Sequence, residues 1–183
     1  MKLVFMLEEL SMKYLLDELL PHVLPKNVEY QTIAHNGKSA LRKSLPIKLR
    51  GWNEPNVSFV VVHDQDNHQD CIALKNELAN LCNISNRKVL VRIACQELEA
   101  WYFGDMQALG SAYGVSKISA FRNKRQLTIP DKIPNPKEAL RKYIPEYQPI
   151  NGARRIAKFM DIDNNTSASF QVFLNGVRNF AGT

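Results

Sequence analysis

A short apolar run at residues 57–62 gives the clearest structural signal in the chain. Its sequence, Val-Ser-Phe-Val-Val-Val, is rich in β-branched residues and passes directly into the polar turn at 63–67. A strand that is apolar at nearly every position is typical of a parallel sheet covered on both faces. Residues 2–7 and 88–94 are similar runs, and 28–35 is a more mixed one that suits a sheet edge. We therefore predict four strands.

Helical patterns separate these strands. Between residues 11 and 20 the leucines and a methionine recur on one face of a 3.6-residue period, so we expect Ser11 to begin this helix and Pro21 to end it. Residues 71–81 repeat the pattern, and another helix is expected at 96–105. Strands that alternate with helices indicate an α/β fold with a mainly parallel sheet of about four strands flanked by helices.

The chain changes character after residue 105. Five of its nine prolines and many basic residues fall between 110 and 150, which predicts loops with short helices. Two closing helices are expected at 154–160 and 167–177. We therefore expect an α/β core at 1–105 and a loop-rich, helical C-terminal extension at 106–183, packed on the core within a single domain.

The composition indicates the cellular compartment in which the protein is expected. No apolar run in the 183 residues approaches the roughly 20 that span a bilayer. The first apolar run is shorter than the core of a signal peptide, so we expect a cytoplasmic protein. Its three cysteines, Cys71, Cys82 and Cys95, form no C-x-x-C pair. We expect them to be free thiols and find no zinc-ligand spacing around them.

Acidic residues follow three of the four predicted strands. Glu8 follows the first, Asp64 and Asp66 follow the third, and Glu97 and Glu99 follow the fourth. Parallel sheets bind ligands at the carboxyl ends of their strands, so these carboxylates should converge on one edge. If strand geometry continues through 64–66, the two aspartates point to the same face and can share one ion. All-oxygen ligands suit Mg²⁺ or Mn²⁺, and we predict such a metal site here.

The same acids also have a simpler interpretation. Asp and Asn are common in turns, so residues 63–67 can be an ordinary polar turn. Glu97 and Glu99 can be acids of a first helical turn, where the helix dipole favours them.

The strand ends also resemble known motifs. Glu8, in Leu-Glu-Glu-Leu-Ser, and the Asp-Gln-Asp run at 64–66 are similar to the Glu and Asp-x-Asp motifs of TOPRIM domains. These domains are the catalytic cores of topoisomerases, primases and overcoming-lysogenization-defect nucleases. Over essentially its whole length, the chain resembles more closely a bacterial family catalogued as domain of unknown function 4276. That resemblance rests on residues 64–66 with Cys71, 91–94 and 97–101 (Glu-Leu-Glu-Ala-Trp), with 37–38 and 167–170 also fitting.

The resemblance implies a TOPRIM-like Rossmannoid fold and a function. Carried over by motif, the catalytic glutamate falls on Glu8 and the metal-binding aspartates on Asp64 and Asp66. Several family members are encoded beside ATPases in phage-defence loci, which implies a Mg²⁺-dependent nuclease or related hydrolase with an ATPase partner. TOPRIM motifs usually have Gly after the glutamate, whereas this chain has Glu9. Of the two later acids, Glu99 is favoured over Glu97 for catalysis.

A basic segment lies between the second and third strands. It carries five cations, which can follow a phosphate backbone or form a solvated basic face: Lys38, Arg42, Lys43, Lys48 and Arg50. A second basic stretch extends from 117 to 142. The net charge of +6 suits a polyanionic partner such as nucleic acid but is modest. Gly37-Lys38 lacks the upstream spacing of a P-loop.

Two classes of function remain open from the sequence. In the first, a nuclease, Asp64 and Asp66 hold the metal, Glu8 is a ligand or general base, and Lys38 or Arg42 offsets phosphate charge. In the second, a non-catalytic module of the same fold docks a partner protein or nucleic acid. Other side chains have two interpretations each: His63 and His68 as proton shuttles or surface residues, and residues 101–103 as base-stacking or packing aromatics.

Overall fold

The centre of the protein is a four-stranded sheet in which every strand is parallel to its neighbours. The structure is a computed structural model and describes residues 1–115, 118 and 127–182. The strands are β1 (Lys2–Leu7), β2 (Glu29–Ala34), β3 (Val57–Asp64) and β4 (Val89–Ala94), arranged in the order β2-β1-β3-β4. The predicted α/β fold is confirmed, and the mixed strand β2 lies at an edge as expected.

The strand order creates a switch point between β1 and β3. From β1 the chain crosses to β2 on one side and then returns to place β3 on the other side of β1. In register, Leu7 at the end of β1 lies beside Ala34 of β2 and Val62 of β3. The residues after β1 and at the end of β3 therefore flank the place where an open parallel sheet usually binds its ligand.

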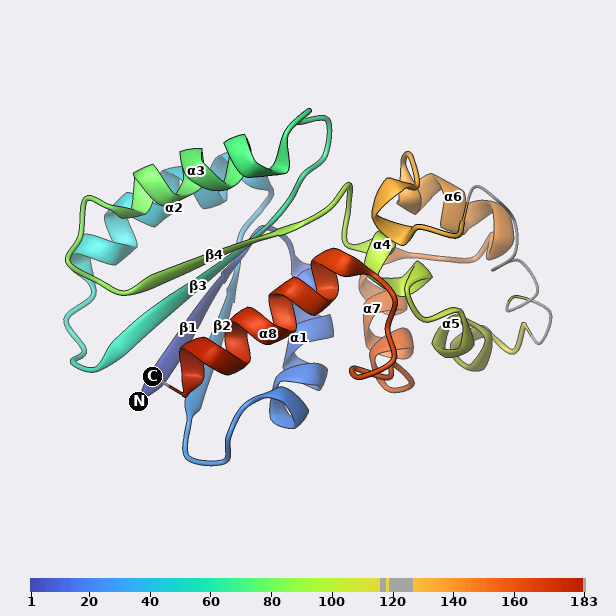
Figure 1. Cartoon of the computed structure of the whole chain (residues 1–183), viewed down its shortest axis with the longest axis horizontal. Coiled ribbons are helices and arrows are strands. Elements are labelled where there is room, and N and C mark those ends of the chain that lie inside the picture. Colours follow the sequence, from blue (N-terminus) through green and yellow to red (C-terminus); the bar gives the residue numbers. More distant parts are fainter. Residues whose placement is uncertain (116–117, 119–126, 183) are drawn as a thin grey trace.

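Helices cover both faces of the sheet (Figure 1). On one face, α1 (Leu10–Val23) and α8 (Ala168–Ala181) share an apolar cluster with Leu3, Phe5 and Val60. On the other face, α2 (Lys38–Gly51) and α3 (Cys71–Cys82) pack against alternate strand residues such as Val4 and Phe59. Because successive side chains of a strand point to opposite faces, a continuous apolar strand fills both clusters.

Some element boundaries differ from those predicted. Helix α1 continues through Pro21 to Val23, because a proline in the last turn removes only one backbone bond of the helix. Its N-cap is Glu9, and Ser11 donates a hydrogen bond to the Glu9 carboxylate instead of capping the helix. Strand β3 extends two residues beyond the predicted end, so that Asp64 belongs to the strand.

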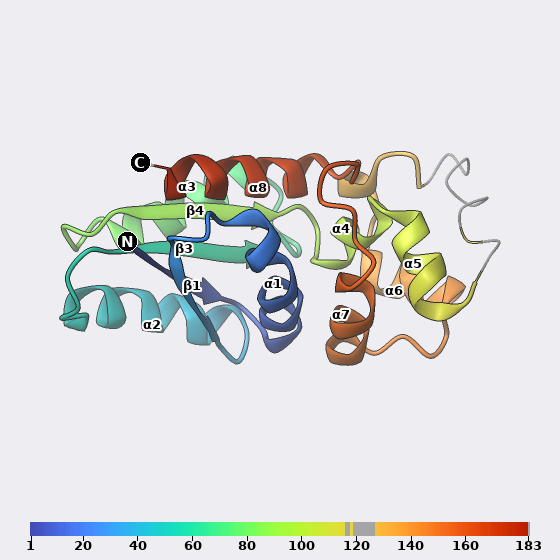
Figure 2. The same cartoon turned by 90° about the horizontal axis from the view of Figure 1, so that it is seen from below.

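The remaining helices lie beyond the carboxyl ends of the strands. These are α4 (Glu99–Phe103), α5 (Met106–Tyr113), the 3₁₀ helix η2 (Pro130–Lys132), α6 (Pro136–Tyr143) and α7 (Pro149–Ala157). Figures 1 and 2 show α4 to α7 grouped at this end of the sheet, while α8 runs back along the sheet face. The helix predicted at 96–105 is shorter, Glu99–Phe103, and a separate helix follows because Asp105 caps α5 by accepting from the amide of Ala108 at 2.9 Å. Helix α7 begins five residues before its predicted start at 154.

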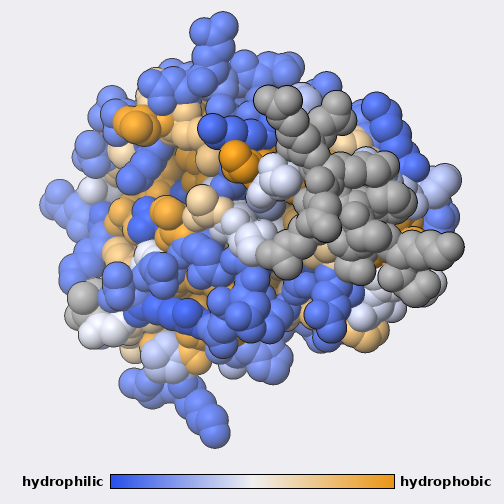
Figure 3. Space-filling model, turned by 45° about the vertical axis from the view of Figure 1, so that its right-hand side comes forward, coloured by the Kyte–Doolittle hydropathy of each residue, from blue (hydrophilic) through white to orange (hydrophobic). Residues whose placement is uncertain are grey.

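The face of the molecule shown in Figure 3 is mainly polar where residues are described, with apolar side chains gathered in small patches. Within the described ranges, no helix is both long enough and apolar enough to cross a membrane.

Candidate functional site

Glu8 and His63 form a buried pair where β1 and β3 end. The register that sets Leu7 beside Val62 brings the next two residues, Glu8 and His63, side by side on the same face of the sheet. His63 Nδ1 lies 3.0 Å from Glu8 Oε2 and also contacts the carbonyl oxygen of Asp64. The same carboxylate oxygen of Glu8 accepts a hydrogen bond from the Asp64 amide at 3.1 Å. Glu8 is thus held in one orientation by β3.

The surroundings of Asp64 disfavour the ionised form of its carboxylate. Asp64 is only 4% exposed, and its Oδ1 has no hydrogen-bond partner among the residues that the structure describes. Burial raises the pKa of Asp64 well above its ordinary value, and the negative charges of Glu8, Glu99, Glu9 and Asp66 raise it further. The charges of four other carboxylates therefore act on Asp64.

Asp66 lies in the candidate site, but strand geometry does not orient its side chain as the sequence suggested. Strand geometry does not continue through it, because β3 ends at Asp64 and Asp66 has a left-handed backbone with φ of 50°. Its carboxylate instead pairs with Lys38, whose Nζ lies 3.1 Å from Asp66 Oδ2. Lys38 begins α2 next to Gly37, which has φ of 85° and donates its amide to the carbonyl of Glu8 at 2.9 Å.

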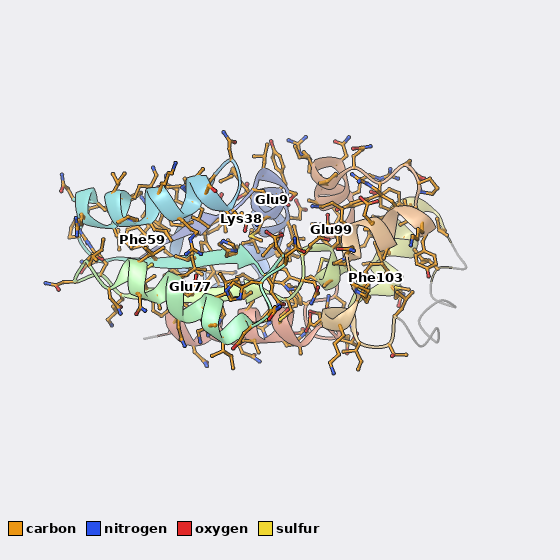
Figure 4. All side chains as sticks on the ribbon, turned by 90° about the horizontal axis from the view of Figure 1, so that it is seen from above. Glu9, Lys38, Phe59, Glu77, Glu99 and Phe103 are labelled. Carbon is orange, nitrogen blue, oxygen red and sulfur yellow. The ribbon has the colours of Figure 1, made fainter. Side chains whose placement is uncertain are left out.

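Glu99 lies at the other side of the cluster, at the start of α4. Its side chain is fully buried, and Tyr147 donates its hydroxyl to Glu99 Oε1 at 2.8 Å. Burial raises the pKa of Glu99 to about 7, although nearby Lys137 opposes this effect. Glu99 Oε2 has no partner within the described part of the chain. Figure 4 shows Glu9, Lys38 and Glu99 near the junction between the sheet and helices α4 to α7.

Lys137, on α6, belongs to the second basic stretch of the sequence, but the sequence analysis did not assign it to the acidic site. Its Nζ lies 3.9 Å from Glu97 Oε1 and 4.0 Å from Glu99 Oε1, and its backbone amide donates to Glu97 Oε2 at 2.9 Å. Burial lowers the pKa of Lys137, but the surrounding carboxylates, Glu99 first, raise it more, so the net pKa is above the ordinary value. Lys137 is therefore a permanent cation that the extension adds to the acidic site.

A polar cavity of about 290 Å³ lies beside Lys38, Asp66 and Glu97. Its walls come from the loops after β3 and β4 and from the starts of α2 and α6: Lys38, Asp66, Asn67, Gln96, Glu97, Asn135 and Pro136. Three of these residues have positive φ, namely Asp66, Gln96 (62°) and Asn135 (47°). Such conformations persist only where surrounding contacts fix them, and they are common in binding sites. Here the Asp66 amide donates to the Gln96 carbonyl at 2.7 Å.

The predicted basic segment forms helix α2, but only its first residue reaches the acidic cluster. Arg42 pairs with Glu77 of α3 at 3.1 Å. Lys43, Lys48 and Arg50 follow along the helix, and Arg50 lies about 18 Å from Lys38 along the axis at 1.5 Å per residue. The structure therefore places Lys38 in the site and the other four cations along a helix that leads away from it. Lys117 and three other cations of the second basic stretch (Arg122, Lys124 and Arg125) lie outside the described residues.

The remaining candidates have structural roles. His68 accepts from the Asp70 amide and lies 3.4 Å from Glu77, at the surface beside α3. Residues 101–103 are buried in the core, so packing accounts for all three aromatic side chains. Trp101, for example, donates its ring N–H to the hydroxyl of Ser169 at 2.9 Å.

The oxygen donors of the cluster suit a hard divalent cation. Among residues 1–115, 118 and 127–182, no three His, Cys, Asp or Glu side chains already form a group that could hold a metal ion. A magnesium site, however, usually has only one or two protein carboxylates and completes its shell with water and substrate oxygens. The free Asp64 Oδ1 meets that need, and the negative charges of Glu8 and Asp66 act on Asp64. Glu97 is already engaged by Lys137.

Comparison with known proteins gives one match. A family model described as "Domain of unknown function (DUF4276)" matches residues 7–178, nearly the whole chain. No curated protein and no solved structure matches the chain.

Proposed function

The chain belongs to the DUF4276 family, and we propose that it is a Mg²⁺-dependent, TOPRIM-like nuclease or a closely related phosphodiester-cleaving hydrolase. One observation carries this proposal. Asp64 is buried at the switch point of a parallel sheet with a free carboxylate oxygen, and four other carboxylates act on it. Such a charge is costly unless a proton or a cation neutralises it, and a divalent cation would bind the ionised carboxylate.

Different residues of the chain would have different roles in such a reaction. Asp64 and Asp66 would hold the metal. Bound there, Mg²⁺ would polarise a phosphate oxygen and offset the charge that develops in the transition state. Glu8, which His63 and the Asp64 amide hold in one orientation, would accept a proton from the attacking water. Lys38 lines the polar cavity and is 56% exposed, so it can leave Asp66 and bind a substrate phosphate.

The biological setting that we propose rests on the resemblance described above. It comprises a nucleic-acid substrate, an ATPase partner and a role in bacterial phage defence in the cytoplasm. The exposed cations of α2 support a nucleic-acid substrate, since Lys43 and Arg50 continue from Lys38 along one helix. A phosphate backbone that enters at Lys38 can follow this helix away from the acidic site.

A second function has one observation in its favour. Three of the acids already have internal partners, because Lys38 pairs with Asp66, Lys137 contacts Glu97, and Tyr147 bonds to Glu99. A site balanced in this way is what a non-catalytic module of the same fold would keep if it only docked a partner protein or nucleic acid. The two functions differ in whether metal binding and cleavage occur.

A cleavage assay on the full chain tests the proposal. Single- and double-stranded DNA and RNA are incubated with the protein in Mg²⁺ or Mn²⁺, with EDTA as the metal-free condition. We expect cleavage that EDTA stops and that the double variant Asp64→Ala, Asp66→Ala abolishes while the circular dichroism spectrum is retained.

Glu18→Ala is the matched control. It removes one exposed carboxylate from α1, outside the acidic cluster, and should leave cleavage unchanged. Full cleavage by the double aspartate variant would rule out this site. Absence of cleavage of all four substrates by a folded, metal-bound protein would favour the docking module.

A further inference from the structure

Two thiols meet beside the acidic site. Cys71, the first residue of α3, and Cys95, the residue after β4, are both half-buried, and their Sγ atoms are 3.3 Å apart. The third thiol, Cys82, is buried at the far end of α3, about 16 Å from Cys71 along the helix axis at 1.5 Å per residue. The chain therefore has one adjacent thiol pair and one isolated thiol.

The backbone on each side of this contact is fixed independently of the sulfur atoms. Asp70 caps α3 by accepting from the Ile72 amide at 2.7 Å, which holds Cys71 in place. The Cys95 amide donates to the hydroxyl of Ser169 on α8 at 3.3 Å. A disulfide needs a sulfur–sulfur separation of about 2.0 Å, so the two sulfur atoms, now 3.3 Å apart, must approach each other by about 1.3 Å.

We propose that Cys71 and Cys95 form a modification site, a thiol pair that a hydroperoxide oxidises to an intramolecular disulfide. The pair lies between the two loops that carry the acidic residues, since Cys71 follows the loop after β3 and Cys95 begins the loop after β4. These loops already contact each other, as the Gln96 amide donates to the side chain of Gln65 at 3.1 Å. The disulfide would add a covalent link to that contact. This inference does not depend on nuclease activity.

The chemistry balances with one hydroperoxide for each pair. The sulfur of one cysteine, as its thiolate, attacks the peroxide, the O–O bond breaks, and that cysteine becomes a sulfenic acid while one water is released when the peroxide is H₂O₂. The second sulfur then attacks the first, which forms the S–S bond and expels hydroxide, and the hydroxide leaves as water with the second thiol's proton. Two thiols are oxidised and one peroxide is reduced. A small dithiol reverses the reaction by exchange.

Oxidation would link the segments that follow β3 and β4 covalently. The bond would join residues 24 positions apart and close a loop that contains all of α3 and β4. Closing such a loop restricts the unfolded chain more than the folded one. The oxidised protein should therefore unfold at a higher temperature than the reduced protein.

Peptide mapping gives a direct test, because trypsin places each cysteine in a separate peptide. Cys71 falls in 51–75, Cys82 in 76–87 and Cys95 in 93–117. The full chain is treated with a small excess of hydrogen peroxide, its remaining thiols are alkylated, and it is digested without reductant. We expect peptides 51–75 and 93–117 to appear joined, with the loss of two hydrogen atoms, while 76–87 is alkylated.

Three results would overturn the proposal. These are a cross-link through Cys82, overoxidation of Cys71 while Cys95 remains a free thiol, and failure of both thiols to react. The variant Cys71→Ser provides the matched control, in which the joined peptide and the rise in unfolding temperature should both be absent. Cys82→Ala should retain the joined peptide. If only Cys82→Ala lost it, the assigned pair would be wrong.

Discussion

The backbone amide of Asp64 donates a hydrogen bond to the Glu8 carboxylate across the gap between β1 and β3, at 3.1 Å. This bond joins the two strands whose connections run in opposite directions along the sheet. The backbone amide of Asp64 thus holds the Glu8 carboxylate in place. The Asp64 side chain itself has no partner for its Oδ1 atom in the described structure. The site therefore has one oriented carboxylate and one with a free oxygen next to it.

Replacing Glu99 by Gln should change how stability depends on pH. The raised pKa means that the folded protein holds a proton on Glu99 more tightly than the unfolded chain. That contribution is complete below the ordinary pKa of 4.5 and is lost as the pH rises through about 7. At about 1.4 kcal/mol per pKa unit, the wild-type protein should lose roughly 3 kcal/mol between these limits.

Urea unfolding in EDTA at pH 5 and pH 8 measures this difference. Glu99→Gln keeps an acceptor for the Tyr147 hydroxyl and carries no charge, so its stability should be close to wild type at pH 5 and higher at pH 8. Equal stabilities at pH 8 would mean that Glu99 is not held protonated by its surroundings.

Lys137→Gln should destabilise the metal-free protein at pH 8. The change removes the cation that contacts Glu97 and Glu99 but leaves the backbone bond to Glu97 intact. We expect a loss of about 1–2 kcal/mol, because buried carboxylates then lack their nearest counter-charge. The loss should be smaller at pH 5, where Glu99 is protonated. Lys75→Gln, on the exposed side of α3, is the control and should change the free energy of unfolding little.

Gly104→Ala tests how closely the extension packs behind the site. A β-carbon at Gly104 would clash with the Asn165 side chain and lie 2.8 Å from the backbone nitrogen of Ser167. The segment that precedes α8 must then move, and we expect a loss of about 2 kcal/mol or more, as for other overpacked cores. Gly51→Ala meets no atom within 4 Å and should be neutral or slightly stabilising. Thermal unfolding of both variants distinguishes a local clash from a general effect of replacing glycine.

Sequence patterns predicted the sheet well because its two central strands, β1 and β3, are apolar on both sides. The apolar runs at 57–62 and 2–7 are typical of buried strands. The rule that ligand-binding residues follow the carboxyl ends of parallel strands then predicted that Glu8 lies near Asp64. Helix α2 was not predicted, since Pro46 and its many cations obscured the regular spacing of Leu41, Leu45 and Leu49.

The parts of the site that come from the extension could not be predicted in this way. Lys137 and Tyr147 reach Glu97 and Glu99 across 40 and 48 residues of sequence. Lys137 and Tyr147 reach these glutamates because α6 and α7 pack near the strand ends. No local periodicity in the sequence predicts that packing. Asp66 was predicted from strand alternation, but its positive φ places it with Lys38 instead.

The central claim is that Asp64 is the principal metal ligand of a cation site at the switch point. Calorimetric titration with Mn²⁺ tests it most directly, on the wild-type protein, on Asp64→Asn and on the control Glu77→Gln, each checked for its fold. We predict binding to the wild type and the control and at least tenfold weaker binding to Asp64→Asn, a difference of about 1.4 kcal/mol or more. Asp64→Asn should also be more stable than the wild type without metal, because the repelled charge is gone. Mn²⁺ binding to Asp64→Asn with wild-type affinity would contradict the account.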